Sequence, residues 1–124
     1  MARKLKRLDG VISVTIVEPV LSEQGWRFSG RDPLTGATHL HELYTRADDH
    51  YTGRATVPVL WDKATGTIVN NESADIVRMF NDGFGAFADE TVDLYPGQLR
   101  PEIDAWNARI YSSLNNGVYR AGFA

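Results

Sequence analysis

The first stretch of the chain changes from a helical to a strand-like spacing of apolar residues. Leu5 and Leu8 are three apart, as on the inner face of a helix, and Asp9-Gly10 then favours a stop. Residues 11–17 form a run rich in β-branched side chains that ends before Pro19, which is typical of a buried strand. A strand that follows directly on a helix end indicates an α/β protein.

The middle of the chain predicts one helix followed by a hairpin. Apolar positions recur at helical spacing up to about His50, at Leu40, Leu43, Tyr44 and Ala47. Residues 57–61 then have the composition of a strand, residues 62–66 that of a turn, and residues 67–69 that of the partner strand.

The last third predicts two helices separated by a linker. Asn70 and Asn71 supply amides that suit a helix start, and an apolar face follows at Ile76, Val77 and Phe80. Residues 81–97 are rich in Gly, Asp and small residues, as in a linker. Pro101 opens a last helix, which we expect to end at 115–117. The apolar stripe of this helix comprises Ile103, Trp106, Ile110 and Leu114. This chain offers too few apolar residues to bury the stripe well.

This order of elements matches a thioredoxin-like fold without its first strand and most of its first helix. We therefore expect an α/β chain with two parts. Residues 1–95 would form an incomplete thioredoxin-like domain, and residues 96–124 the first helix of an all-α domain.

Composition narrows the possible functions. The 124 residues are 43% hydrophobic, which suits a packed core, and carry a net charge of −3, without the basic excess of a nucleic-acid binder. The basic residues at positions 3–7 favour a solvated helix face over an anion-binding patch. No apolar run reaches the ~20 residues that span a bilayer. The chain contains no cysteine, which fits a reducing compartment, so we expect a cytoplasmic protein.

Val57-Pro58 is the first segment that suggests chemistry. Pro58 has no N–H for a strand ladder, so we expect it where a strand begins. If the bond is cis, as at this point of thioredoxin-like proteins, the N–H and C=O of Val57 face outward and suit an extended peptide. A trans-proline that simply starts a strand is the more frequent alternative.

Asn71-Glu72-Ser73 is the second such segment. A helix N-terminus favours a carboxylate, Ser73 can add a hydroxyl donor, and Glu72 can accept from an ammonium group. An α-amino acid head group would match this pair. The alternative is that these residues only cap the helix.

The whole chain resembles a known enzyme family in several motifs that occur in the right order. They are Gly25–Phe28, Gly53–Lys63, Thr67–Asn81 and Asn115–Ala124. In these motifs the chain is similar to the glutathionyl-hydroquinone reductases, which are xi-class, omega-like glutathione transferases. The resemblance implies a thioredoxin-like domain followed by a helical one, glutathione as co-substrate and glutathionylated hydroquinones as substrates.

The same resemblance assigns roles to six residues. Val57, beside a cis-Pro58, would pair with the peptide backbone of glutathione, and Glu72 and Ser73 would hold its γ-glutamyl head. Trp26 would lie against the tripeptide, and Arg54 would pair with a carboxylate.

This sequence departs from the family pattern at the nucleophile. The family's Cys-Pro-Trp-Ala segment, where a helix N-terminus lowers the thiol pKa, has no counterpart here. Most of the helical domain, whose tyrosines help to form the quinone pocket, is missing too. We therefore expect an interior fragment that binds glutathione, has no catalytic residue of its own and is inactive alone.

A different hypothesis is a non-catalytic module that binds glutathione or a protein and self-associates. Association would cover the exposed sheet and the last helix, and a homodimer is expected. We expect no metal cofactor, because His39 and His41 lack a third ligand in the pattern and suit a loop better.

Overall fold

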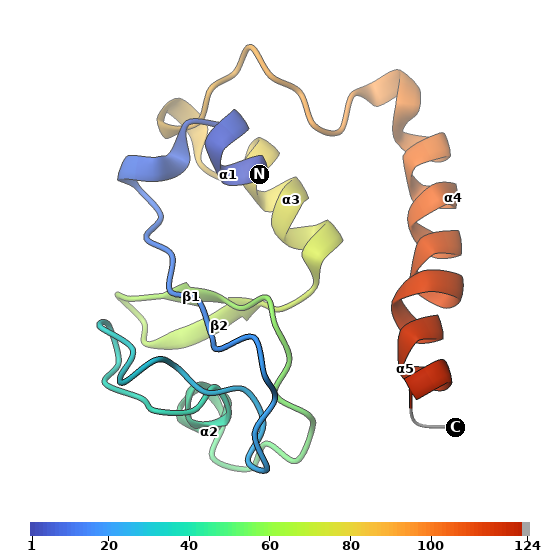
Figure 1. Cartoon of the computed structure of the whole chain (residues 1–124). Helices are drawn as coiled ribbons and strands as arrows, with labels where there is room; N and C mark the ends of the chain where they lie inside the picture. The colour runs from blue at the N-terminus through green and yellow to red at the C-terminus, as the bar shows by residue number, and fades with distance from the viewer. Residues whose placement is uncertain (123–124) are drawn as a thin grey trace.

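The computed structural model describes residues 1–122. Figure 1 shows a hairpin with α2 on one side and α3 on the other, and a long helix that stands apart at the C-terminal end. The elements in chain order are α1 (Ala2–Leu5), η1 (Leu8–Gly10), α2 (His41–Ala47), β1 (Leu60–Asp62), β2 (Thr67–Asn70), α3 (Ser73–Asp82), η2 (Gly85–Phe87), η3 (Gly97–Leu99), α4 (Arg100–Ile110), the π-helical turn η4 (Tyr111–Asn115) and α5 (Asn116–Gly122). The expected mixture of helices and strands is therefore present.

The predicted hairpin is confirmed. β1 and β2 run antiparallel, with Leu60 opposite Asn70 and Asp62 opposite Thr67, and the register is irregular after Leu60. Asp62 closes the turn, because its carboxylate accepts hydrogen bonds from the Ala64 amide (2.8 Å) and the Thr65 hydroxyl (2.7 Å). Gly66 has a φ of 65°, which a residue with a side chain rarely adopts.

The main core lies between α2 and the hairpin. Its buried members are Phe28, Ala37, Leu40, Leu43 and Tyr44, and Val59, Trp61 and Ile68 pack against them from the hairpin side. The predicted apolar face of the helix is thus confirmed. The helix is shorter than expected, because Asp48 has extended backbone angles and the chain turns away before His50.

The N-terminal segment packs beside α3 (Figure 1), and one of its basic residues is buried. Lys6 is only 2% exposed, and its ammonium group donates a hydrogen bond of 2.7 Å to the carbonyl of Val92. The expectation of a solvated basic face is wrong for this residue. A lysine stem is apolar enough to be buried when the charged end finds an acceptor.

The predicted strand at residues 11–17 is not formed. Only Val17 makes a bridge, to Phe28, while Val14 and Ile16 are 61% and 79% exposed. A strand needs a hydrogen-bonding neighbour, and within residues 1–122 no strand pairs with positions 11–16. β-branched composition alone therefore gave the wrong prediction.

The last helix continues past the expected stop at 115–117. The chain passes through the π-turn η4 into α5, and Gly117 lies within α5 without a positive φ. A glycine ends a helix when it takes the left-handed conformation, and this one does not. The expected exposure of the stripe is confirmed for Trp106, Ile110 and Leu114. The final two residues of the motif 115–124 lie outside the described part of the chain.

A cluster of polar side chains joins α4 to α3. Asp104 of α4 accepts hydrogen bonds from the guanidinium of Arg78 on α3 and from the hydroxyl of Tyr95 in the connecting loop. The guanidinium groups of Arg78 and Arg100 lie 4.6 and 4.9 Å from the centre of the Tyr95 ring. We call Arg78, Tyr95, Arg100 and Asp104 the α3–α4 clasp. Hydrogen bonding to Asp104 also raises the pKa of the Tyr95 phenol.

Candidate functional site

The Val57-Pro58 peptide bond is cis, so the less frequent of the two alternatives holds. Pro58 precedes β1, as expected for a proline at the start of a strand, and both residues are exposed. Within residues 1–122 the backbone of Val57 forms no hydrogen bond. Its N–H and C=O are therefore open to an extended peptide that adds to the sheet edge.

The N-terminus of α3 is open as well. Glu72 is the N-cap residue, and its side chain makes no capping hydrogen bond. Its backbone N–H donates to the side-chain oxygen of Asn70 at 2.7 Å, so Asn70 shapes the approach to the helix. Glu72 and Ser73 are exposed, and their side chains have no hydrogen-bond partner in the described part of the chain. The alternative that Glu72 and Ser73 only cap the helix with their side chains is therefore wrong.

The expected capping role of Asn71 is wrong. Its side-chain amide points into the structure and donates to the hydroxyl of Tyr44 at 3.1 Å. The same hydroxyl donates to the carbonyl of Thr56 at 2.7 Å. The residue before Val57 and the residue before Glu72 are therefore bound to one side chain of α2, which brings the two open segments together.

Trp26 and Arg54 lie on segments beside this pair. The Trp26 carbonyl accepts a hydrogen bond from the Leu40 amide at 2.8 Å, and its ring packs against the main core. Arg54 is exposed, and its carbonyl accepts from the Tyr51 hydroxyl at 2.8 Å. Among the described residues, no hydrogen bond connects either side chain to Glu72 or Ser73.

Glu42, which was not predicted from the sequence, holds the backbone just before α2. Its carboxylate accepts from the backbone amides of Thr38 and His39 and from the Thr38 hydroxyl, each at 2.8 Å. These hydrogen bonds, led by the one from His39, lower the pKa of Glu42 to about 2. A glutamate in the first turn of a helix, where its carboxylate can reach back to the amides that precede the helix, is the signal that points to this arrangement.

The histidines form no metal centre with other residues. The rings of His39 and His41 stack at 5.4 Å between centres. Across residues 1–122, no group of three or more His, Asp or Glu side chains is arranged to hold a metal ion. No helix in this range is long and apolar enough to cross a membrane.

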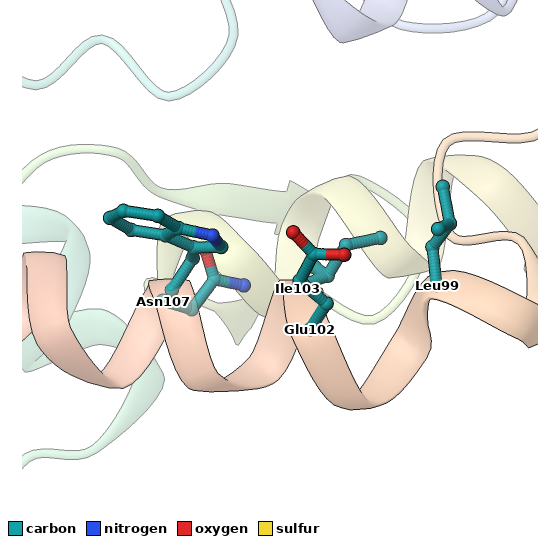
Figure 2. Close-up of a pocket in the computed structure, with 5 residues that line it drawn as sticks. Leu99, Glu102, Ile103 and Asn107 are labelled. Carbon is teal, nitrogen blue, oxygen red and sulfur yellow. The ribbon is translucent and has the colours of Figure 1, made fainter.

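A hollow of about 330 Å³ lies along α4, away from these segments. Figure 2 shows Leu99, Glu102, Ile103 and Asn107 around it, and Trp106 completes the lining. All of these residues come from α4 and the turn before it. A surface built by one helix supplies no converging polar groups from other elements, so it is a weaker candidate than the region of Val57 and Glu72.

The fold is that of a glutathione transferase domain. Residues 1–82 match the family "Glutathione S-transferase, N-terminal domain", and the chain belongs to that family. The predicted family, with its thioredoxin-like domain followed by a helical segment, is thereby confirmed.

Similar proteins narrow the class further. The chain is 52% identical to glutathionyl-hydroquinone reductase YqjG of Escherichia coli over 98% of its length and 39% of that protein. It is 48% identical to glutathionyl-hydroquinone reductase PcpF of Sphingobium chlorophenolicum over 98% of its length and 41% of that protein.

Solved structures agree with this placement. The glutathione-bound structure of YqjG has a TM-score of 0.89 and 51% identity, over 99% of this chain and 42% of that one. Glutathione-S-transferase Xi from Phanerochaete chrysosporium has a TM-score of 0.90 and 48% identity, over 99% of this chain and 45% of that one. The chain thus spans about two fifths of the length of the curated relatives, 39% and 41% of the two named above.

Proposed function

We propose that this chain is the glutathione-binding part of a glutathionyl-hydroquinone reductase. The observation that carries the proposal is the unpaired backbone of Val57, beside a cis-proline, held next to the uncapped N-terminus of α3. A peptide with a free α-amino acid head matches both segments. One of the solved relatives is described as glutathione-bound, which supports glutathione as this peptide.

The six residues act on different parts of the glutathione molecule. The N–H and C=O of Val57 pair with the cysteine backbone of glutathione, and the cis bond to Pro58 presents them outward. Glu72 accepts from the ammonium of the γ-glutamyl head, while the Ser73 hydroxyl and the first amides of α3 bind its α-carboxylate. Trp26 packs against the tripeptide, and Arg54 pairs with the glycine carboxylate.

The reaction that we propose for the complete site is the reduction of a glutathionyl-hydroquinone. It needs a thiolate that attacks the sulfur of the glutathionyl thioether, so that a disulfide with glutathione forms, the bond from sulfur to the ring carbon breaks, and that carbon takes up a proton. A second glutathione then reduces the disulfide and restores the thiolate. Since no cysteine occurs in these 124 residues, we propose that the chain alone binds glutathione without turnover. Residues 1–95 form the glutathione-binding domain, and residues 96–124 begin the helical domain that takes part in binding the quinone-type substrate.

A titration of the chain with reduced glutathione, followed by amide NMR, tests the binding site. We expect shifts at Val57, Glu72 and Ser73, with Glu72→Gln lowering the affinity about tenfold through loss of the ion pair with the ammonium group. Cysteinylglycine, which lacks the γ-glutamyl head, should bind much more weakly than glutathione. Glu102→Gln, an exposed position on α4, is the control and should leave the affinity unchanged.

The proposal fails if glutathione causes no shifts in the folded chain. It also fails if glutathione and cysteinylglycine bind equally, because the head group would then have no site.

A second candidate is a module that self-associates as a homodimer. The exposed apolar side chains of Trp106, Ile110 and Leu114 along α4 and η4 favour it. Sedimentation velocity over a range of concentrations should then show a dimer that Trp106→Ser and Leu114→Ser together dissociate. A folded monomer at all concentrations would contradict this candidate.

A further inference from the structure

The hydroxyl of Tyr44 uses its full hydrogen-bonding capacity. It donates to the Thr56 carbonyl at 2.7 Å, and it accepts from the Thr56 amide at 3.2 Å and from the Asn71 side-chain amide at 3.1 Å. A phenol has one proton to donate and two lone pairs, so these three bonds satisfy it. The side chain is 3% exposed, and hydrogen bonds in such surroundings are strong because water does not compete.

These bonds join two segments that are separate in the chain. Thr56 precedes Val57 on the approach to β1, and Asn71 precedes Glu72 on the approach to α3. The Tyr44 ring comes from α2, which lies on the opposite side of the hairpin from α3 (Figure 1). Apart from this hydroxyl, the one direct bond between Thr56 and Asn71 in the described residues is long, at 3.4 Å between the amide nitrogen and the threonine Oγ1.

We propose that the Tyr44 hydroxyl is the positioning group that fixes the Val57 backbone relative to Glu72 and Ser73. This inference rests on the proposed function, in which one glutathione molecule contacts both segments at once. A ligand that bridges two segments gains most when their spacing is fixed before binding. Tyr44 touches neither the ligand nor a reacting atom; it acts through Thr56 and Asn71.

The test is Tyr44→Phe, which removes one oxygen atom and keeps the packed ring. We expect the affinity for glutathione to fall roughly tenfold, which corresponds to the loss of one well-formed hydrogen bond. The affinity for cysteinylglycine, which does not reach Glu72 and Ser73, should fall much less. The preference for glutathione over cysteinylglycine therefore shrinks, and a simple loss of stability would not change this ratio in the folded protein.

Tyr95→Phe is the matched control. It deletes the same atom from a hydroxyl that bonds to Asp104 in the α3–α4 clasp, so it should leave the affinity and the preference unchanged. Asn71→Ala removes one of the three hydrogen bonds of the Tyr44 hydroxyl. It replaces Tyr44→Phe as the test variant if Tyr44→Phe does not fold. It should give a smaller change in the same direction.

Amide NMR of the ligand-free proteins tests, without glutathione, whether Tyr44 positions the two segments. In Tyr44→Phe we expect the amide signals of Val57 and of Glu72 to shift together, and the Thr56 amide, which loses its acceptor, to exchange faster with solvent. If wild-type chain binds no glutathione, the proposed function fails, and these amides still test the positioning. If Tyr44→Phe keeps the wild-type preference, or leaves both amides unchanged, the inference is overturned.

Discussion

At the scale of single residues, stability depends most on side chains that are enclosed by segments distant in the sequence. Leu8, the first residue of η1, is fully buried. The neighbouring Lys6 holds the loop after α3 through its ammonium and its carbonyl, which accepts from the Asp89 amide at 2.9 Å. The N-terminal turn is thus part of the packed structure, although its helix has only four residues.

Leu8→Ala should lower the free energy of unfolding by about 2–5 kcal/mol, because it removes buried methyl groups and leaves a cavity. Leu114→Ala removes the same atoms from a side chain that is 62% exposed and should change stability by less than about 0.5 kcal/mol. Urea unfolding followed by tryptophan fluorescence measures both. Equal losses for the two variants would contradict the burial seen in the structure.

At the scale of elements, the start of α2 depends on a carboxylate. Glu42 lies in the first turn of the helix and binds the amides of Thr38 and His39 just before it. Since α2 carries Leu43 and Tyr44 into the core, the charge state of Glu42 affects the element on which the proposed site is built.

The lowered pKa of Glu42 predicts a loss of stability in acid. The ordinary value is 4.5 and the folded value is about 2, so folding favours the ionised form. The stabilisation is fully present above pH 4.5 and is lost as the pH falls from 4.5 towards 2. Stability measured across this range should depend less on pH in Glu42→Gln than in the wild-type chain.

Thr38→Val is a useful companion, because it removes the hydroxyl donor and keeps the backbone amides. It should reduce the pH dependence only in part. An unchanged pH profile in Glu42→Gln would show that other carboxylates control the acid transition.

At the scale of the whole molecule, the position of α4 depends on polar contacts. Trp106, Ile110 and Leu114 are exposed, so apolar packing within the described chain contributes little here. The α3–α4 clasp supplies the ion pair between Arg78 and Asp104, whose side chains are 36% and 50% exposed. Such exposed pairs are weak and are screened by salt.

A double-mutant cycle of Arg78→Ala and Asp104→Ala should give a coupling energy of about 0.5 kcal/mol or less at physiological salt. Both single variants should let α4 move more freely relative to α3, while the main core stays intact. Residual dipolar couplings of α3 and α4 measure this relative motion. A coupling above about 2 kcal/mol would mean that the pair is far better shielded from water than the structure shows.

The sequence alone predicted the parts that short-range interactions determine. The hairpin follows from strand composition around a turn closed by Asp62 and Gly66, and α2 and α3 follow from apolar spacing. The position of Pro58 on the approach to β1 also agrees with the prediction. In each case the backbone hydrogen bonds that define the element join residues that are close in the sequence.

The tertiary structure decided what depends on distant partners. The β-branched run at 11–17 is not a strand, because a strand requires a neighbour that composition does not reveal. Lys6 is buried because Val92 offers a carbonyl, and Asn71 turns away from the helix end because Tyr44 offers a hydroxyl. Hydrogen bonds of this kind join residues 86 and 27 positions apart, and only folding brings such groups within reach of each other.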